Sequence, residues 1–342
     1  MTNSTLTAQP VPTTIDPALP SAVGPLSEWV VDLLAGTGSP DAATPDVEAA
    51  DPWGLDLQLA LYVCYELHYR SFAGVAGSWE WNPGLLALRS RMERSFLDAV
   101  RREVGDRAEG RTAADLMAEL AIEPVDGTGL SYYLRDEGSW EQMREYFVHR
   151  SLYHLKEADP HAFAIPRLVG GAKAAFVAVE YDEYGAGRGE RVHQQLFADL
   201  LLAADLDASY LGYLDEVPAD ALSVVNLMSL FGLHRDLRGA AVGHFASTEI
   251  TSPPGSARIV AALERMDAPS PCVVFYREHV EADAVHEQIV RHDVVGDMVA
   301  REPALDADVV FGILARDVVE DRLADHMMAS WQSGTTSLRT KG

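Results

Sequence analysis

The sequence predicts an all-α protein, and three observations carry this prediction. From Gly54 onward, apolar residues recur at intervals of three and four, which is the spacing that one face of an α-helix requires. No stretch alternates apolar and polar residues over the length of a strand between hairpin turns, and β-branched runs are short. Proline falls where helices begin or end, as at Pro83 and Pro160.

The helical pattern divides the chain into four parts. Residues 1–50 are rich in Thr, Pro, Ala and Ser and are expected to be mostly disordered. Residues 51–130 are expected to form a helical region that supports dimerisation, residues 131–330 a helical bundle and residues 331–342 a flexible tail. Within the bundle, helices are expected at residues 139–159, 171–184, 190–204, 221–238, 239–250 (ended by SPPG), 256–266, 271–302 and 306–331.

Composition excludes several classes of function. The 342 residues include 52 acidic and 27 basic side chains, and the resulting net charge of −25 disfavours nucleic acids and anionic membranes as partners. No apolar run approaches the roughly 20 residues that span a bilayer, and the N-terminus does not resemble a secretion signal, so we expect a cytoplasmic protein. Two isolated cysteines favour neither a disulfide framework nor a thiolate metal site.

The clearest chemical signal is the run His279-Val-Glu-Ala-Asp283-Ala-Val-His286. Spacings of four and seven residues place its two imidazoles and one carboxylate within an arc of about 60° on one helix face. These ligand types suit first-row metals such as iron or manganese. A solvated acidic face could produce the same run. Two neighbouring pairs are rival clusters: His292 with Asp297, and Asp325 with His326.

One helix supplies only half of a metal site in a bundle, because such sites draw Glu and His from several facing helices. Carboxylates on otherwise apolar helices are informative here, because burying a charge is costly without a partner. Each of them taken alone is also compatible with an ion pair or a helix end. The candidates are Glu157, Glu180, Glu183 and Glu249, together with His193 at the start of a helix.

Three stretches carry a resemblance to a known family. CYELHYRSFAG near Glu66, VEYDEYGAGRGERVHQQLF from Val179 and FYREHVEADAVH from Phe275 resemble the heme-oxygenase-like di-iron oxidases and oxygenases, also called iron-containing redox enzymes. The resemblance covers roughly residues 55–328 and implies a heme-oxygenase-like helical bundle with an N-terminal helical extension. The order of acids and histidines is similar to that of the N-oxygenating branch, the type found in the N-oxygenase domain of streptozotocin nitrosourea formation.

The resemblance implies a ligand set of three histidines and four carboxylates, one more than the six ligands usual for the family. Glu183, at a helix end beside Gly185, is the predicted extra ligand and catalytic residue, and Glu180 is its rival. The implied cofactors are two Fe²⁺ ions, with O₂ as co-substrate and an external electron donor. The predicted ligands are Glu157, Glu183, His193, Glu249, His279, Asp283 and His286.

The resemblance also implies an activity. We expect N-oxygenation of a small amine, guanidine or amino-heterocycle in natural-product biosynthesis. The first alternative is oxidative decarboxylation or C–C cleavage of a fatty or amino acid, and an alternative of another class is a non-catalytic helical metal-binding scaffold. A carboxylate-rich core argues against heme, and no β-rich segment follows the helical region to provide an N–N bond-forming half.

Overall fold

The computed structural model confirms the all-α prediction. It describes residues 16–39, 42–123 and 127–340, apart from the side chains of residues 281–284, and this part of the chain contains no strand. The main helices are α1 (Pro25–Ala35), α2 (Leu55–Glu66), α3 (Pro83–Val104), α4 (Ala113–Leu120), α5 (Leu130–Asp136), α6 (Trp140–His154), α7 (Asp159–Ala162), α8 (Gly170–Glu183), α9 (His193–Ala203), α10 (Ala219–Leu233), α11 (Arg238–Arg265), α12 (Ser270–Gln288), α13 (Asp297–Arg301) and α14 (Asp306–Gln332).

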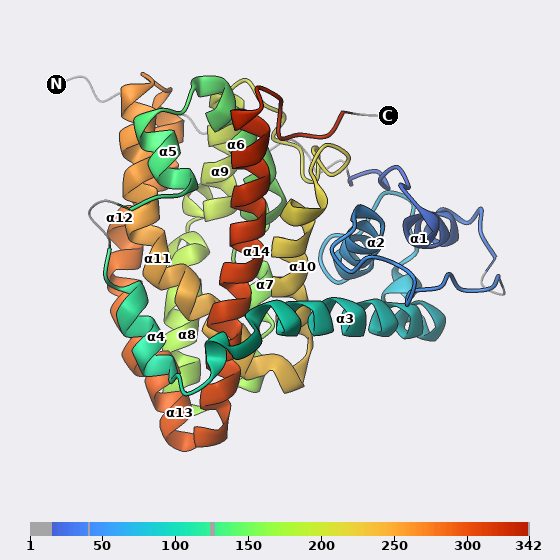
Figure 1. Ribbon diagram of the computed structural model, residues 1–342, viewed down its shortest axis with the longest axis horizontal. Coiled ribbons are helices and arrows are strands. Elements are labelled where there is room, and N and C mark those ends of the chain that lie inside the picture. Colours follow the sequence, from blue (N-terminus) through green and yellow to red (C-terminus); the bar gives the residue numbers. More distant parts are fainter. Residues whose placement is uncertain (1–15, 40–41, 124–126, 341–342) are drawn as a thin grey trace.

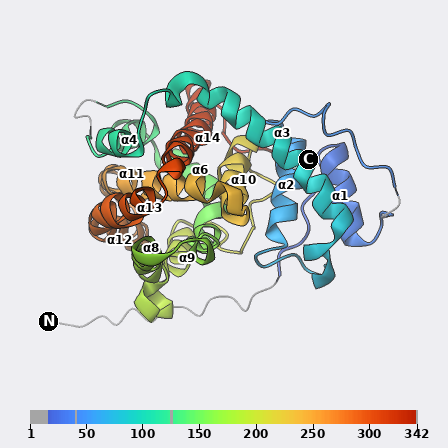
Figure 2. The same ribbon diagram turned by 90° about the horizontal axis from the view of Figure 1, so that it is seen from below.

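The later helices form an upright bundle, and the first three lie beside it (Figure 1). Seen from below, α14 lies on one side of the bundle and α8 and α9 lie on the other, with α6, α10 and α11 between them (Figure 2). Helix α2 packs against α10, and α3 reaches α14, so the N-terminal helices share one apolar core with the bundle. No helix in the described ranges is long and apolar enough to cross a membrane.

Local sequence signals explain where several helices begin. The Ser139 side chain accepts a hydrogen bond from the backbone N–H of Gln142, and the side-chain oxygen of Gln142 accepts one from the backbone N–H of Ser139. This reciprocal pair is a capping box at the start of α6. Asn82 caps α3, and Pro83 occupies its first turn, where the missing N–H costs nothing. Helices α3 and α6 therefore begin at the residues where the sequence signals predict a helix start.

Helices α11 and α14 cross at unusually close range. A Cβ atom added at Gly243 would overlap the carbonyl oxygen of Val309, and one added at Gly312 would overlap that of Ala240. Glycine at both positions lets the two backbones touch, as small residues do wherever helices approach closely. This contact fixes the face of α11 that carries His244 relative to α14.

The expected helix break at SPPG is wrong. Helix α11 runs without interruption from Arg238 to Arg265 and contains both Pro253 and Pro254. Each proline removes one backbone hydrogen bond, but extensive packing against α12 and α14 holds the helix together. Tertiary packing here overrides the local signal.

Two terminal predictions also need correction. Within the segment expected to be disordered, Pro25–Ala35 form α1, because its apolar face buries Val30 completely, and Asp56 accepts hydrogen bonds from two N–H groups of its first turn. Residues 1–15 lie outside the described residues. The expected flexible tail is ordered to residue 340: buried Ser337 donates to Glu145, from its N–H at 2.8 Å and its hydroxyl at 2.6 Å.

Candidate metal centre

Six of the seven predicted ligands have described side chains, and all six are buried within the bundle. They converge from separate elements, which is how bundle-core metal sites are built. Glu157 lies between α6 and α7, Glu183 ends α8, His193 begins α9, Glu249 lies on α11, and His279 and His286 lie on α12.

The first group joins Glu157, Glu183, His193 and His279, each with one donor atom within 4.8 Å of the others. The Nδ1 atom of His193 lies 2.7 Å from Oε2 of Glu183 and 4.0 Å from Oε2 of Glu157. The Nε2 atom of His279 lies 3.5 Å from Oε1 of Glu157. Two ligand atoms about 2.1 Å from one metal ion lie about 3 Å apart in cis and about 4 Å apart in trans. The observed separations therefore fit a shared ion.

The second group joins Glu183, Glu249 and His286 under the same distance limit. The Nδ1 atom of His286 lies 3.1 Å from Oε2 of Glu249 and 3.8 Å from Oε1 of Glu183. Asp283, the seventh predicted ligand, lies on α12, but its side chain lies outside the described residues, so its role stays a prediction.

Glu183 belongs to both groups, and its two oxygens face different histidines. Oε2 faces His193 in the first group, and Oε1 faces His286 in the second. A carboxylate in this position would be available to a cation in either group. Glu180, its rival, lies one turn earlier on α8 and belongs to neither group.

Outer hydrogen bonds orient both histidines of α12. The Nδ1 atom of His279 lies 2.8 Å from the carbonyl oxygen of Phe275, and donation to it leaves Nε2 facing Glu157 with its lone pair. The Nε2 atom of His286 lies 3.2 Å from Asp182, and donation there leaves Nδ1 facing the second group. Histidines that bind metals usually donate their other nitrogen in this way, which fixes the tautomer and the ring orientation.

Sequence reasoning missed two residues of this outer layer. His154 lies with its Nδ1 atom 2.9 Å from Oε1 of Glu157, and Asp182 holds His286. The signal for His154 was present, since it precedes Glu157 by three residues at the end of α6. Asp182 had no comparable signal, because its contact with His286 joins two segments that lie far apart in the sequence.

The buried carboxylates of the site are not fully balanced by positive side chains, and Glu180 shows this most clearly. Both side-chain oxygens of Glu180 are buried without a hydrogen-bond partner among the described residues. Burial raises the pKa of Glu180 well above its usual value, and the neighbouring Glu183 and Glu249 carboxylates raise it further. Burial alone would lower the pKa of His193, but the Glu183 and Glu157 carboxylates together outweigh this effect, and the pKa is raised.

Glu157 behaves differently from Glu180. Burial acts to raise its pKa, but His154 and His279 outweigh this effect and hold the pKa well below the usual value. Oε2 of Glu157 nevertheless has no hydrogen-bond partner in the described structure, and Nδ1 of His193, although 2.7 Å from Oε2 of Glu183, makes no well-aligned hydrogen bond there. Buried oxygen and nitrogen atoms that face one another without hydrogen bonds could both be ligands of a divalent cation between them.

The rival clusters do not form a metal group in the described structure. His292 is exposed, and Asp297 is committed to Arg301 at 2.8 Å and to the N–H of Ala172. His326 lies 2.9 Å from the backbone oxygen of Ser337.

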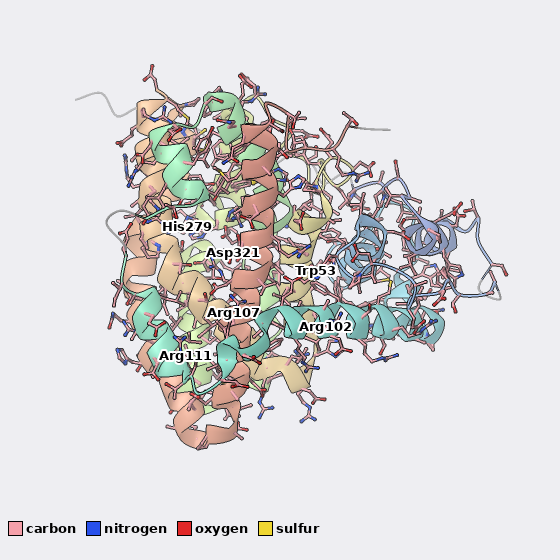
Figure 3. All side chains as sticks on the ribbon, in the orientation of Figure 1. Trp53, Arg102, Arg107, Arg111, His279 and Asp321 are labelled. Carbon is pink, nitrogen blue, oxygen red and sulfur yellow. The ribbon has the colours of Figure 1, made fainter. Side chains whose placement is uncertain are left out.

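A cavity of about 420 Å³ adjoins the centre. Glu157, Glu183, Glu249 and His279 are among its lining residues, and further residues of α5, α6, α7, α10, α11, α12 and α14 contribute to the lining. Figure 3 labels two of its residues, His279 on α12 and Asp321 on α14. The acids and histidines therefore border a space that a small molecule can enter.

An all-α bundle whose core gathers carboxylates and imidazoles around two adjacent positions defines a class of redox metalloprotein. A profile of the family described as "Iron-containing redox enzyme" matches residues 144–321, which is more than half of the chain. The chain belongs to this family, and iron is the metal that the donor set fits. The comparison with curated proteins found no match.

Proposed function

We propose that this chain is a non-heme di-iron oxygenase that uses O₂ to N-oxygenate a small amine, guanidine or amino-heterocycle in natural-product biosynthesis. The observation that carries the proposal is the position of Glu183, whose two oxygens face the histidines of two separate ligand groups. A mononuclear site would not need a second group around a shared carboxylate. Two Fe²⁺ ions in these groups would supply the electrons that activate O₂.

The residues of the chain have distinct roles in this proposal. Glu157, His193 and His279 would hold one ion, and Glu249 and His286 would hold the other. Asp283, a ligand that the resemblance implies, would complete the set. Imidazoles fixed by outer hydrogen bonds define the geometry, and carboxylates offset the charge of the cations. Glu183 is the last residue of α8. Gly185 follows with a φ of 71°, which glycine adopts readily and which ends the α-helix, so no further α-helical turn packs over the Glu183 side chain.

Two features support N-oxygenation over the other activities that the resemblance implies. The order of ligands, including the additional Glu183, is similar to that of the N-oxygenating branch. Arginine, histidine and hydroxyl side chains also line the cavity, so it suits a polar substrate better than a fatty chain. An external electron donor would return the centre to its reduced form between turnovers. As a separate point, we propose that residues 51–130 support a homodimer.

Anaerobic loading with Fe²⁺ followed by exposure to O₂ tests the proposal. The expected result is two irons per chain, a transient visible absorption, and a product that has gained oxygen by mass. Loss of carbon dioxide from the substrate would instead indicate decarboxylation. A folded protein that binds no iron would support the scaffold alternative. His279→Ala should remove iron from the first group, since it deletes one of its two histidines.

A further inference from the structure

The cavity beside the metal centre has a second polar wall on the opposite side of the bundle. Glu180 and Glu183 from α8 line the cavity, and so do Arg316 and Glu320 from α14. Helices α8 and α14 lie on opposite sides in the view from below, with α6, α10 and α11 between them (Figure 2). A molecule that fills the cavity therefore has one end at the centre and the other near α14.

Three arginines line this cavity, and two of them are already occupied. Arg150 donates two hydrogen bonds to Glu320, at 2.8 Å and 2.7 Å. Arg258, near the mouth, donates to Ser131 and Glu123 and stacks on a tyrosine ring. Both guanidinium groups are thereby committed to partners within the protein.

Arg316 is the exception. It is half-buried, and its ion pair is with the adjacent Asp317 at 3.7 Å, which is too long for a hydrogen bond. No hydrogen bond reaches its guanidinium from any residue that the structure describes. A guanidinium presents five donors in a planar fork that matches a carboxylate. Arg316 therefore offers the cavity a fork whose donors the described protein leaves available.

His244 adds a second, independent observation on the same wall. It is 3% exposed, it lines the cavity, and its Nε2 atom has no hydrogen-bond partner among the described residues. Its Nδ1 atom lies 3.2 Å from Nε2 of His161, so a proton donated by His161 leaves His244 with an N–H group at Nε2. Burial, His161 and the charge of Arg316 all lower the pKa of His244, which keeps it neutral.

From this geometry we propose that Arg316 and His244 form a carboxylate-binding subsite, and that the substrate is an amine or guanidine that also carries a carboxylate, as an amino acid does. Arg316 supplies charge and a bidentate fork, and His244 supplies one further N–H donor. The inference rests on the proposed function, because it assigns the oxidised nitrogen to the other end of the cavity.

The subsite also separates the two candidate reactions. Oxidative decarboxylation needs the carboxylate near the metal centre, whereas binding at α14 places it at the far end. Two further acids lie near Arg316: Asp317, its ion-pair partner at 3.7 Å, which does not line the cavity, and Asp321, which lines the cavity and is exposed. Glu320 is paired with Arg150, Asp317 with Arg316 itself, and Asp321 is exposed, so none of the three acids is an unpaired buried charge that would oppose an anion at Arg316.

Calorimetry on the anaerobic Fe²⁺-loaded protein tests the subsite with two matched pairs of probes, L-lysine with cadaverine and L-arginine with agmatine. Within each pair the second molecule lacks only the carboxylate. In at least one pair the amino acid should bind more tightly than its partner. Arg316→Gln should weaken binding of that amino acid by roughly ten- to a hundredfold and leave its partner unchanged, since hydrogen bonds to charged groups contribute on this scale.

Arg258→Gln is the matched control, since it removes a cavity arginine that is already occupied, and it should preserve the preference. If Arg316→Gln does not fold, Arg316→Lys keeps the charge without the fork and should still weaken the amino acid severalfold. The subsite is refuted if neither amino acid is preferred, or if the Arg316 variants weaken both members of a pair equally. Iron content measured on the same samples separates this outcome from a failure of the di-iron proposal, which would appear as fewer than two irons in the unmodified protein.

Discussion

Replacing Glu183 with alanine tests the shared ligand directly. The first group would keep Glu157, His193 and His279, whereas the second would keep only Glu249 and His286 among the described ligands. Iron content should therefore fall from two ions per chain to about one, with the remaining ion in the first group. Because even outer-layer changes at metal sites cost about ten- to a hundredfold in affinity, the remaining ion should bind at least that much more weakly.

Anaerobic titration with Fe²⁺, followed by metal analysis after gel filtration, measures this change. Glu180→Ala is the matched control, because Glu180 is buried on the same helix but belongs to neither ligand group. It should keep two irons. The reasoning fails if Glu183→Ala keeps two irons with unchanged affinity, or if Glu180→Ala loses one while Glu183→Ala does not.

Three further changes test the electrostatics and the packing. Because burial raises the pKa of Glu180, the metal-free protein should lose stability as pH rises from the unfolded value of 4.5 through the raised folded value. In urea unfolding, Glu180→Gln should flatten the dependence of the unfolding free energy on pH and stabilise the metal-free form by about 1–3 kcal/mol at neutral pH. An unchanged pH dependence would contradict this reasoning. Lys156→Met leaves Glu66, which is 0% exposed, without its ion-pair partner at 2.8 Å, and should cost about 3–5 kcal/mol in chemical unfolding; a cost below about 1 kcal/mol would be inconsistent with this. Gly312→Ala pushes a methyl group into the backbone of α11 and should cost about 1–3 kcal/mol in thermal unfolding, so an unchanged melting temperature would show that the helices can separate freely.

The sequence predicts the all-α class, which the structure confirms, and it also predicts several residues that the structure brings together in the candidate centre. Spacing alone placed His279 and His286 on one helix face, and the structure brings both into ligand groups. Acids on apolar helices pointed to Glu157 and Glu249 for a physical reason, since a buried carboxylate requires a partner. These signals are local, so they can be read without the fold.

Signals that depend on packing were out of reach. The continuity of α11 through Pro253 and Pro254 depends on contacts with α12 and α14 that no local pattern records. The choice between Glu180 and Glu183 depends on which carboxylate faces His193 and His286 across the bundle, and the two lie about one turn apart on the same helix. The availability of Arg316 likewise cannot be recognised from the sequence, because it depends on which partners Arg150 and Arg258 contact in the folded protein.

Iron stoichiometry and spectroscopy on the anaerobically loaded, unmodified protein test the central claim most directly. Mössbauer spectra of ⁵⁷Fe²⁺-loaded protein should show two irons per chain in two distinct environments, both of which change on exposure to O₂. One iron per chain at saturation, or two irons that do not react with O₂, would contradict a di-iron oxygenase built around Glu183.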